Sequence, residues 1–198
     1  MRRNALRFGI TGAVALSLIV YSCGTDRYSL GRRAPDSDQY RYELTLTFLD
    51  EEELIERFSK INNPFLSPYT FLKNKNLTTF ELVIENRSPG NLTLQIALST
   101  VTLATGTNKT YYARNQFKLS QFWEGLPDDQ KRGTPGKLKY VINKNVLENS
   151  TYVKSGETIR GLLVFQGNIQ KWSETEVHIP LFNERDEFIV EYVEKVIF

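Results

Sequence analysis

Apolar and polar residues alternate along three stretches of the chain, and this pattern restricts the fold more than any other feature. Apolar residues occupy every second position over 42–48, over 80–85 and again over 92–98. Period-two alternation is typical of a β-strand with one buried face. Residues 86–91, between the last two stretches, are rich in Asn, Ser, Pro and Gly, so we expect these two strands to pair as a hairpin.

Two short segments space their apolar residues as helices do. Residues 51–61 follow Asp50, with Glu53 placed to complete a capping box, and a second helix is expected at 117–123. Residues 127–136 are expected to form a polar loop. Further strands are expected at 101–104, 109–114, 137–143, 158–165, 175–181 and 187–198. Many short strands, few helices and no regular alternation of the two favour an all-β sandwich, formed as one domain over 41–198.

Two motifs carry a family resemblance that covers roughly 78–198. The strand 80–86, which ends at Asn86 before a turn, and the stretch 155–165, which enters a strand through Gly156-Glu157, resemble the immunoglobulin-like (telokin-like) sandwich domains of many bacterial lipoproteins. The resemblance implies an immunoglobulin-like β-sandwich with one or two short helical insertions. That family shares no catalytic residues, so the resemblance also implies a binding or structural module.

The first 22 residues have the organisation of a secretory signal peptide. Arg2, Arg3 and Arg7 precede an apolar run over 8–21, and Ser22 is a small residue before the chain's only cysteine, Cys23. The run is shorter than the roughly 20 apolar residues that a membrane-spanning helix needs. We therefore expect residues 1–22 to be a cleaved signal peptide.

Residues 20–23, Val-Tyr-Ser-Cys, resemble the lipobox that the lipoprotein-processing peptidase recognises. The resemblance implies a lipoprotein whose Cys23 becomes a diacylglyceryl cysteine that also carries an acyl chain such as palmitate. Tyr21 is bulkier than the lipobox pattern prefers, and a secreted or membrane-anchored protein in which Cys23 is incidental stays an alternative. Gly24 stands where enteric lipoproteins retained in the inner membrane have Asp, which implies an outer-membrane anchor of unspecified face.

The segment that follows the cysteine is poor in apolar residues. Residues 24–40 contain mainly Gly, Ser, Asp and Arg, with Pro35 among them. Such a composition is typical of a linker without regular structure. We interpret 23–40 as the lipid attachment site and a flexible tether.

Charge and residue counts exclude several classes of function. The formal net charge of +2 arises in the signal peptide, and the mature chain would carry 22 basic and 23 acidic residues. Nucleic-acid binding needs a basic surface, which a near-neutral chain without basic runs does not provide. With one His and one Met, the chain cannot form a His-rich metal site. We therefore expect no metal and no cofactor.

Candidate catalytic residues have simpler structural interpretations. His178 lies in an apolar strand, and no Gly-x-Ser-x-Gly motif accompanies it. Acidic clusters at 51–53, 128–129 and 186–187 supply carboxylates, but they are expected in a helix N-terminus, a loop and a turn. Since no phosphate-binding glycine loop occurs either, we expect no enzymatic activity.

The chain is rich in aromatic residues, with 12 Phe, 10 Tyr and 2 Trp. A sandwich core takes up most of these, and the best candidates for exposed rings near turns are Tyr112, Trp123 and Trp172. We therefore expect an outer-membrane lipoprotein whose non-catalytic sandwich binds a protein or other component of the cell envelope. Binding of surface polysaccharide is the alternative, and a hydrolase with paired carboxylates is a third, disfavoured reading.

Overall fold

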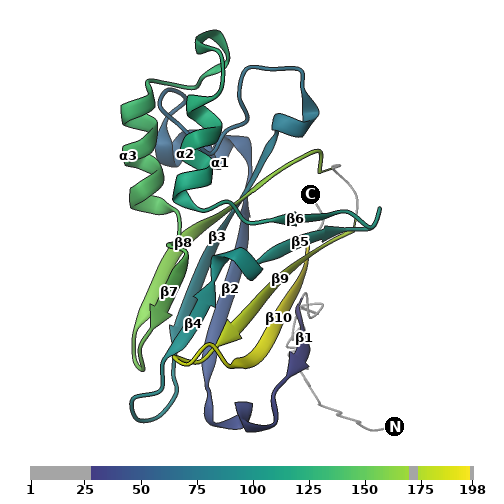
Figure 1. Ribbon diagram of the computed structural model, residues 1–198, viewed down its shortest axis with the longest axis vertical. Helices are drawn as coiled ribbons and strands as arrows, with labels where there is room; N and C mark the ends of the chain where they lie inside the picture. Colours follow the sequence, from purple (N-terminus) through teal and green to yellow (C-terminus); the bar gives the residue numbers. More distant parts are fainter. Residues whose placement is uncertain (1–27, 170–173, 197–198) are drawn as a thin grey trace, which may run out of the picture.

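The computed structural model describes residues 28–169 and 174–196, which fold into two antiparallel β-sheets packed face to face. Figure 1 shows the sheets with three α-helices gathered at one end of the strands. The predicted class of fold, an all-β sandwich with short helical insertions, is confirmed. The described residues form three α-helices rather than one or two.

The smaller sheet has three strands in the order β2-β3-β8. They are β2 (Tyr42–Leu49), β3 (Leu77–Asn86) and β8 (Thr158–Gln166). Tyr42 pairs with Asn86 and Leu49 with Thr79, and Leu77 pairs with Gln166. The predicted strands at 42–48, 80–85 and 158–165 are therefore all present.

The larger sheet has seven strands, five of them in the order β1-β10-β9-β4-β7. These five are β1 (Tyr28–Arg33), β10 (Phe188–Val196), β9 (Thr175–Phe182), β4 (Leu94–Ala97) and β7 (Ser150–Val153). Strand β5 (Thr102–Thr105) pairs with β9 and with β6 (Thr110–Tyr112). Because β4 and β5 both pair with β9, they form one strand interrupted by a 3-10 turn, η3 (Leu98–Thr100).

The space between the sheets is filled by apolar side chains from both. Members that are less than 2 % exposed include Phe80, Leu82, Ile84, Leu163 and Phe165 of the smaller sheet and Leu94, Ile96, Leu103, Val177, Ile179 and Leu181 of the larger one. The alternation in the sequence identified the inward-facing side chains of β3 and β4 correctly. Apolar burial on this scale is the main stabilising term of such a domain.

The predicted hairpin over 80–98 is wrong. Strand β3 lies in the smaller sheet and β4 in the larger one, so the turn between them carries the chain across the sandwich. Asn86, which is fully buried, holds this crossing because its Nδ2 donates to the backbone oxygens of Leu92 and Val153, both at 2.8 Å. A hairpin and a crossing of the sandwich bury the same alternating residues, and period-two alternation therefore does not distinguish them.

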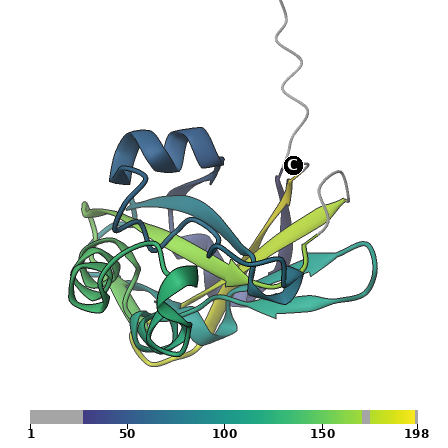
Figure 2. The same cartoon turned by 90° about the horizontal axis from the view of Figure 1, so that it is seen from above.

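The helices cover the outer face of the smaller sheet and form a second apolar core there. They are α1 (Glu51–Phe58), α2 (Gln116–Glu124) and α3 (Pro135–Asn145), and in Figure 2 they gather to one side of the sheets. Leu162 and Val164 of β8 face this second core, whereas Leu163 and Phe165 face the first. Both faces of β8 are therefore buried over residues 162–165, and this explains why four apolar residues follow one another there. Strand β8 has this pattern although it is the outermost strand in the order β2-β3-β8.

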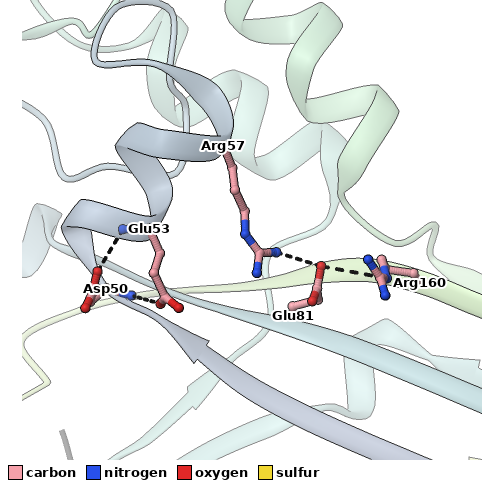
Figure 3. A network of polar contacts seen from close by, with 5 residues as sticks. All are labelled: Asp50, Glu53, Arg57, Glu81 and Arg160. Atoms are coloured by element: carbon pink, nitrogen blue, oxygen red, sulfur yellow. Dashed lines mark hydrogen bonds and ion pairs between the residues drawn. The ribbon is translucent and has the colours of Figure 1, made fainter.

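Helix α1 is fixed at its start and along its side. Asp50 and Glu53 form the predicted capping box, and Ser59, with φ of 64°, ends the helix earlier than expected. Figure 3 shows Arg57 donating from Nη1 to Oε1 of Glu81 on β3 at 2.8 Å, with Arg160 of β8 at 3.9 Å from the same oxygen. Glu81 is 14 % exposed, so this pair joins helix and sheet at a partly screened position.

The segment expected as a strand at 137–143 is helical and belongs to α3. Because α3 already begins at Pro135, the predicted loop at 127–136 is two residues too long. Pro135 occupies the first turn, where a missing N–H costs nothing. Leu138 and Ile142, four residues apart, are buried, whereas Tyr140 between them is 69 % exposed. Apolar residues at 138, 140 and 142 also fit a strand, but only the helical spacing matches the observed burial.

The predicted tether is wrong from Tyr28 onward. Strand β1 pairs with β10, with Tyr28 opposite Glu194 and Leu30 opposite Tyr192, and the 3-10 helix η1 (Pro35–Gln39) follows it. Arg33, expected in a linker, donates to Ser37 at 2.6 Å and pairs with Asp38 at 2.9 Å. The first strand of the sandwich therefore begins at Tyr28, thirteen residues before the expected start of the domain at residue 41.

Candidate functional site

Two of the four residues singled out from the sequence, Cys23 and Trp172, lie outside the described residues. Lipid attachment at Cys23 and a binding role for Trp172 stay predictions. No helix among the described residues is both long and apolar enough to cross a membrane.

Tyr112 lies at the end of β6 and is 62 % exposed, as predicted. It pairs with Thr102, which pairs with His178, and His178 pairs with Val193. Residues paired across a sheet point to the same face. The next residues along these strands, Leu103 and Val177, also pair with each other, and both are buried between the sheets. Since neighbouring residues of a strand point to opposite faces, Tyr112 lies on the outer face of the larger sheet.

Trp123 is buried, and the prediction of an exposed ring there is wrong. It is 1 % exposed, its Nε1 donates to the backbone oxygen of Pro64 at 3.0 Å, and it stacks edge-on with Phe122. Leu119 and Trp123, four residues apart on α2, face the second core together. This spacing was visible in the sequence and signals burial.

His178 lies in a strip of charged side chains on the outer face of the larger sheet. Its Nε2 is 3.5 Å from Glu176, its Nδ1 is 3.5 Å from Glu191, and Lys195 is 3.7 Å from Glu176. The imidazole thus lies between two carboxylates on the strand face, with Thr102 as its neighbour on β5. Within the described residues, no group of His, Cys, Asp and Glu is placed to hold a metal ion.

The carboxylate clusters have local structural roles. The first is the N-terminal turn of α1. In the second, a hydrogen bond from Lys131, at 2.8 Å, and its charge hold the pKa of Asp128 below its ordinary value. In the third, Asp186 has φ of 61° in the turn between β9 and β10. Each cluster is thus explained by a cap, a surface ion pair or a turn.

The sequence interpretation missed the segment 59–76 between α1 and β3, here called the apolar loop. It exposes four large apolar side chains: Ile61 (69 %), Tyr69 (50 %), Phe71 (103 %) and Leu72 (56 %). Half of the strongly exposed large apolar residues in the described chain lie in this one loop. A concentration of exposed apolar side chains in one segment makes it a candidate interaction site.

The base of the apolar loop is firmly attached to the domain. Phe65 and Leu66 belong to the second core, and Asn63 is buried with Nδ2 donating to the oxygens of Leu54 and Ser59, both at 2.8 Å. Arg132, from the loop before α3, donates to the oxygen of Ser67 at 2.7 Å.

Arg132 also holds the side chain of Tyr69. Its guanidinium carbon lies 3.7 Å from the centre of the Tyr69 ring, and the Tyr69 amide donates to the oxygen of Gln130 at 3.0 Å. A stacked and hydrogen-bonded base therefore presents Phe71 and Leu72 at the tip of the apolar loop.

The apolar loop is also positively charged. It contains Lys60, Lys73 and Lys75 and no acidic residue. Lys60 and Lys73 are exposed, while the Nζ of Lys75 lies 5.8 Å from the ring centre of Phe122. Two of these lysines are direct neighbours in sequence of the exposed Ile61 and Leu72.

Beneath the base of the apolar loop lies a cavity of about 340 Å³. Its lining is mainly apolar and includes Leu49, Leu54, Phe65 and Leu77, with Arg132 at one side. A second cavity of about 340 Å³ adjoins Tyr112 and is lined by polar groups such as Arg114, Lys118 and Gln166.

No protein-family model and no curated protein matches the chain. A solved structure of a structural-genomics target called SoR45 is similar over 80 % of this chain and 84 % of that one, at 7 % identity and a TM-score of 0.34. The putative ApaA protein from Bordetella pertussis is similar over 78 % and 91 % of the two chains, at 10 % identity and a TM-score of 0.34. Likeness at this level carries no conclusion about function.

Proposed function

We propose that this chain is a bacterial outer-membrane lipoprotein, attached through lipid on Cys23, whose non-catalytic sandwich binds another component of the cell envelope through the apolar loop. The observation that carries the binding role is the full exposure of Phe71 at the tip of a firmly based loop. Burying one such ring in a partner contributes about 1.5–3 kcal/mol. Leu72, the next residue in the chain, is 56 % exposed as well.

The anchoring part of the proposal is supported by the order of features at the N-terminus. A charged start, a short apolar run and the lipobox-like residues 20–23 precede the domain directly. Strand β1 begins at Tyr28, so only residues 24–27 separate Cys23 from the larger sheet. Five Cα steps span at most about 18 Å. A domain held this close to its anchor is well placed to bind components in or near the membrane.

The test is site-specific photo-crosslinking in intact cells with the full, lipidated chain. A photoreactive residue in place of Phe71 is expected to form an adduct with an envelope component, whether protein, polysaccharide or lipid. The same residue in place of Phe117, which is 66 % exposed on α2, is the matched control. Equal labelling at the two positions, or none at either, would count against the apolar loop. Mass spectrometry of the mature N-terminus tests Cys23, and an unmodified start would refute the anchor.

A carbohydrate-binding role has one observation in its favour. Tyr112 presents an exposed ring beside a cavity that carries hydrogen-bond donors from Arg114, Lys118 and Gln166. Stacking of a sugar on an aromatic ring beside polar groups is a common mode of saccharide recognition. Glycan-array binding that Tyr112→Ala abolishes and Phe71→Ser leaves unchanged would favour this second function.

A further inference from the structure

We propose that the apolar loop, residues 59–76, docks onto the surface of an anionic lipid bilayer and gives the domain a second membrane attachment. This inference rests on the proposed function and specifies its binding partner. It is carried by three features of the molecule: the exposed apolar tip of the loop, the charge of the loop, and the short connection between the domain and its anchor.

The first feature is how the apolar side chains are presented. Phe71 and Leu72 protrude from the tip and are 103 % and 56 % exposed, while the described cavity near the loop lies at its base. A protruding ring needs either a rigid partner with a matching hollow or a deformable apolar medium. The interface of a bilayer is such a medium, and aromatic residues are enriched there.

The second feature is charge complementarity. Lys60 and Lys73 directly flank Ile61 and Leu72, and the loop contains no carboxylate that would neutralise them. Lysine stems can lie along apolar surface while the ammonium reaches the headgroups. Anionic lipid surfaces attract basic residues within about one Debye length. Apolar tip and basic flanks together match a lipid surface better than an uncharged apolar patch on a protein.

The third feature is where the chain enters the domain. Strand β8 ends at Gln166 opposite Leu77, the residue into which the apolar loop leads. The next strand, β9, starts at Thr175, and Tyr28 is opposite Glu194, which is itself opposite Val177 of β9. Tyr28 therefore lies near the end of the larger sheet where β9 starts, while in Figure 1 β1 is at the lower right and the apolar loop is at the top.

The connection between the domain and its anchor is short. With at most about 18 Å between Cys23 and Tyr28, a lipid on Cys23 holds the start of β1 close to the membrane. The lipid chains on Cys23 anchor the chain, and the apolar loop adds a second contact with the bilayer that sets how the domain lies on it. In Figure 1 the apolar loop lies beside the helices at the top, and its last residues are joined to β8 because Gln166 Nε2 donates to the oxygen of Asn74 at 3.2 Å. The side chains of Phe71 and Leu72 are exposed there.

The experiment measures vesicle binding by the mature chain carrying Cys23→Ser, which takes no lipid of its own. Vesicles of phosphatidylcholine alone are compared with vesicles containing about one third phosphatidylglycerol. We expect binding to the anionic vesicles that weakens with added salt. Phe71→Ser is expected to weaken it roughly tenfold, and Lys73→Ala roughly fivefold.

Phe117→Ser is the control, since Phe117 is also a strongly exposed phenylalanine, 66 % exposed on α2 and outside the apolar loop. It should change vesicle binding less than twofold, and thermal unfolding of both serine variants should match the parent. No binding to anionic vesicles, or equal losses from Phe71→Ser and Phe117→Ser, overturns the inference. If vesicles do not bind but crosslinking at position 71 captures a protein or polysaccharide, the lipid assignment fails and the proposed function stands. If neither is found, both fail.

Discussion

The indole Nε1 of Trp123 donates a hydrogen bond to the backbone oxygen of Pro64, 59 residues earlier in the chain, at 3.0 Å. This bond joins α2 to the base of the apolar loop, and both partners are buried. The same tryptophan packs with Leu119 and Phe65 in the second core. Trp123, which was predicted to be an exposed aromatic residue, therefore helps to hold α2 and the apolar loop against the smaller sheet.

Trp123→Ala should destabilise the domain by about 3–5 kcal/mol, because it removes a large buried side chain and leaves a cavity. Trp123→Phe keeps most of the volume and should cost less, with the unpaired Pro64 oxygen contributing about 1–3 kcal/mol. Urea unfolding followed by circular dichroism measures both. Tyr112→Ala is the control and should stay within about 0.5 kcal/mol of the parent. Similar losses for Trp123→Ala and Tyr112→Ala would contradict the observed burial.

Gly161 of β8 lies where Leu147 leaves no room for a side chain. A Cβ at this position would overlap Cγ and Cδ2 of Leu147, so Gly161→Ala should force Leu147 to move and cost about 1–3 kcal/mol. Gly136, in the first turn of α3, is the matched control because nothing lies within 4 Å of its Cβ position.

Gly136→Ala should leave stability unchanged or raise it by up to about 1 kcal/mol, since alanine favours the helix. Both variants are compared by thermal and urea unfolding. If the Gly161→Ala and Gly136→Ala proteins are equally stable, the side chain of Leu147 can move aside without lowering the free energy of unfolding, and the prediction is wrong.

Most of the strands and their buried faces could be predicted from the sequence, but β1, β7 and the pairing of the strands could not. Alternation placed Phe80, Ile84, Leu94 and Ile96 inward, and all four are in the first core. Which strand lies beside which depends on the connection at Asn86, and its two hydrogen bonds across the sandwich have no periodic signal in the sequence. Similarly, residues 137–143 fit both the strand and the helix period.

The candidate site was predicted less well than the fold, because exposure of single aromatic residues was judged from nearby turns. Tyr112 is exposed and Trp123 is not. The apolar loop was missed because its residues follow neither period. Its buried members, such as Phe65 and Leu66, and its exposed members, such as Phe71 and Leu72, are equally apolar, and only the three-dimensional structure distinguishes them.

Asn86→Ala should destabilise the domain strongly. The change leaves the backbone oxygens of Leu92 and Val153 and the amide of Ser88 without their partner at a buried crossing. Each buried polar group left unpaired costs about 1–3 kcal/mol. Asn91→Ala, at an exposed position in the same connection, is the control and should have little effect. Equal stabilities of the two variants in urea would mean that Asn86 does not hold the crossing.

Tyr42 should make the domain sensitive to alkaline pH. Burial raises the pKa of its phenol above the ordinary value, and the nearby Arg33 opposes this rise in part. Because the folded state holds the neutral form, the unfolded chain releases the phenol proton first as pH passes the ordinary tyrosine pKa near 10. The free energy of unfolding is therefore unaffected below that pH and falls as pH rises through the folded pKa.

Tyr42→Phe should remove this alkaline loss, because the variant has no proton to release at that position. Melting temperatures followed by circular dichroism from neutral pH to about pH 11 test this expectation. Tyr140→Phe is the control, since Tyr140 is 69 % exposed on α3 and should leave the alkaline loss in place. If the parent and Tyr42→Phe lose stability in parallel as pH rises, another group is responsible. Tyr42 is the first residue of β2 and packs against the inner core, so a parallel loss would also show that its phenol is not held neutral there.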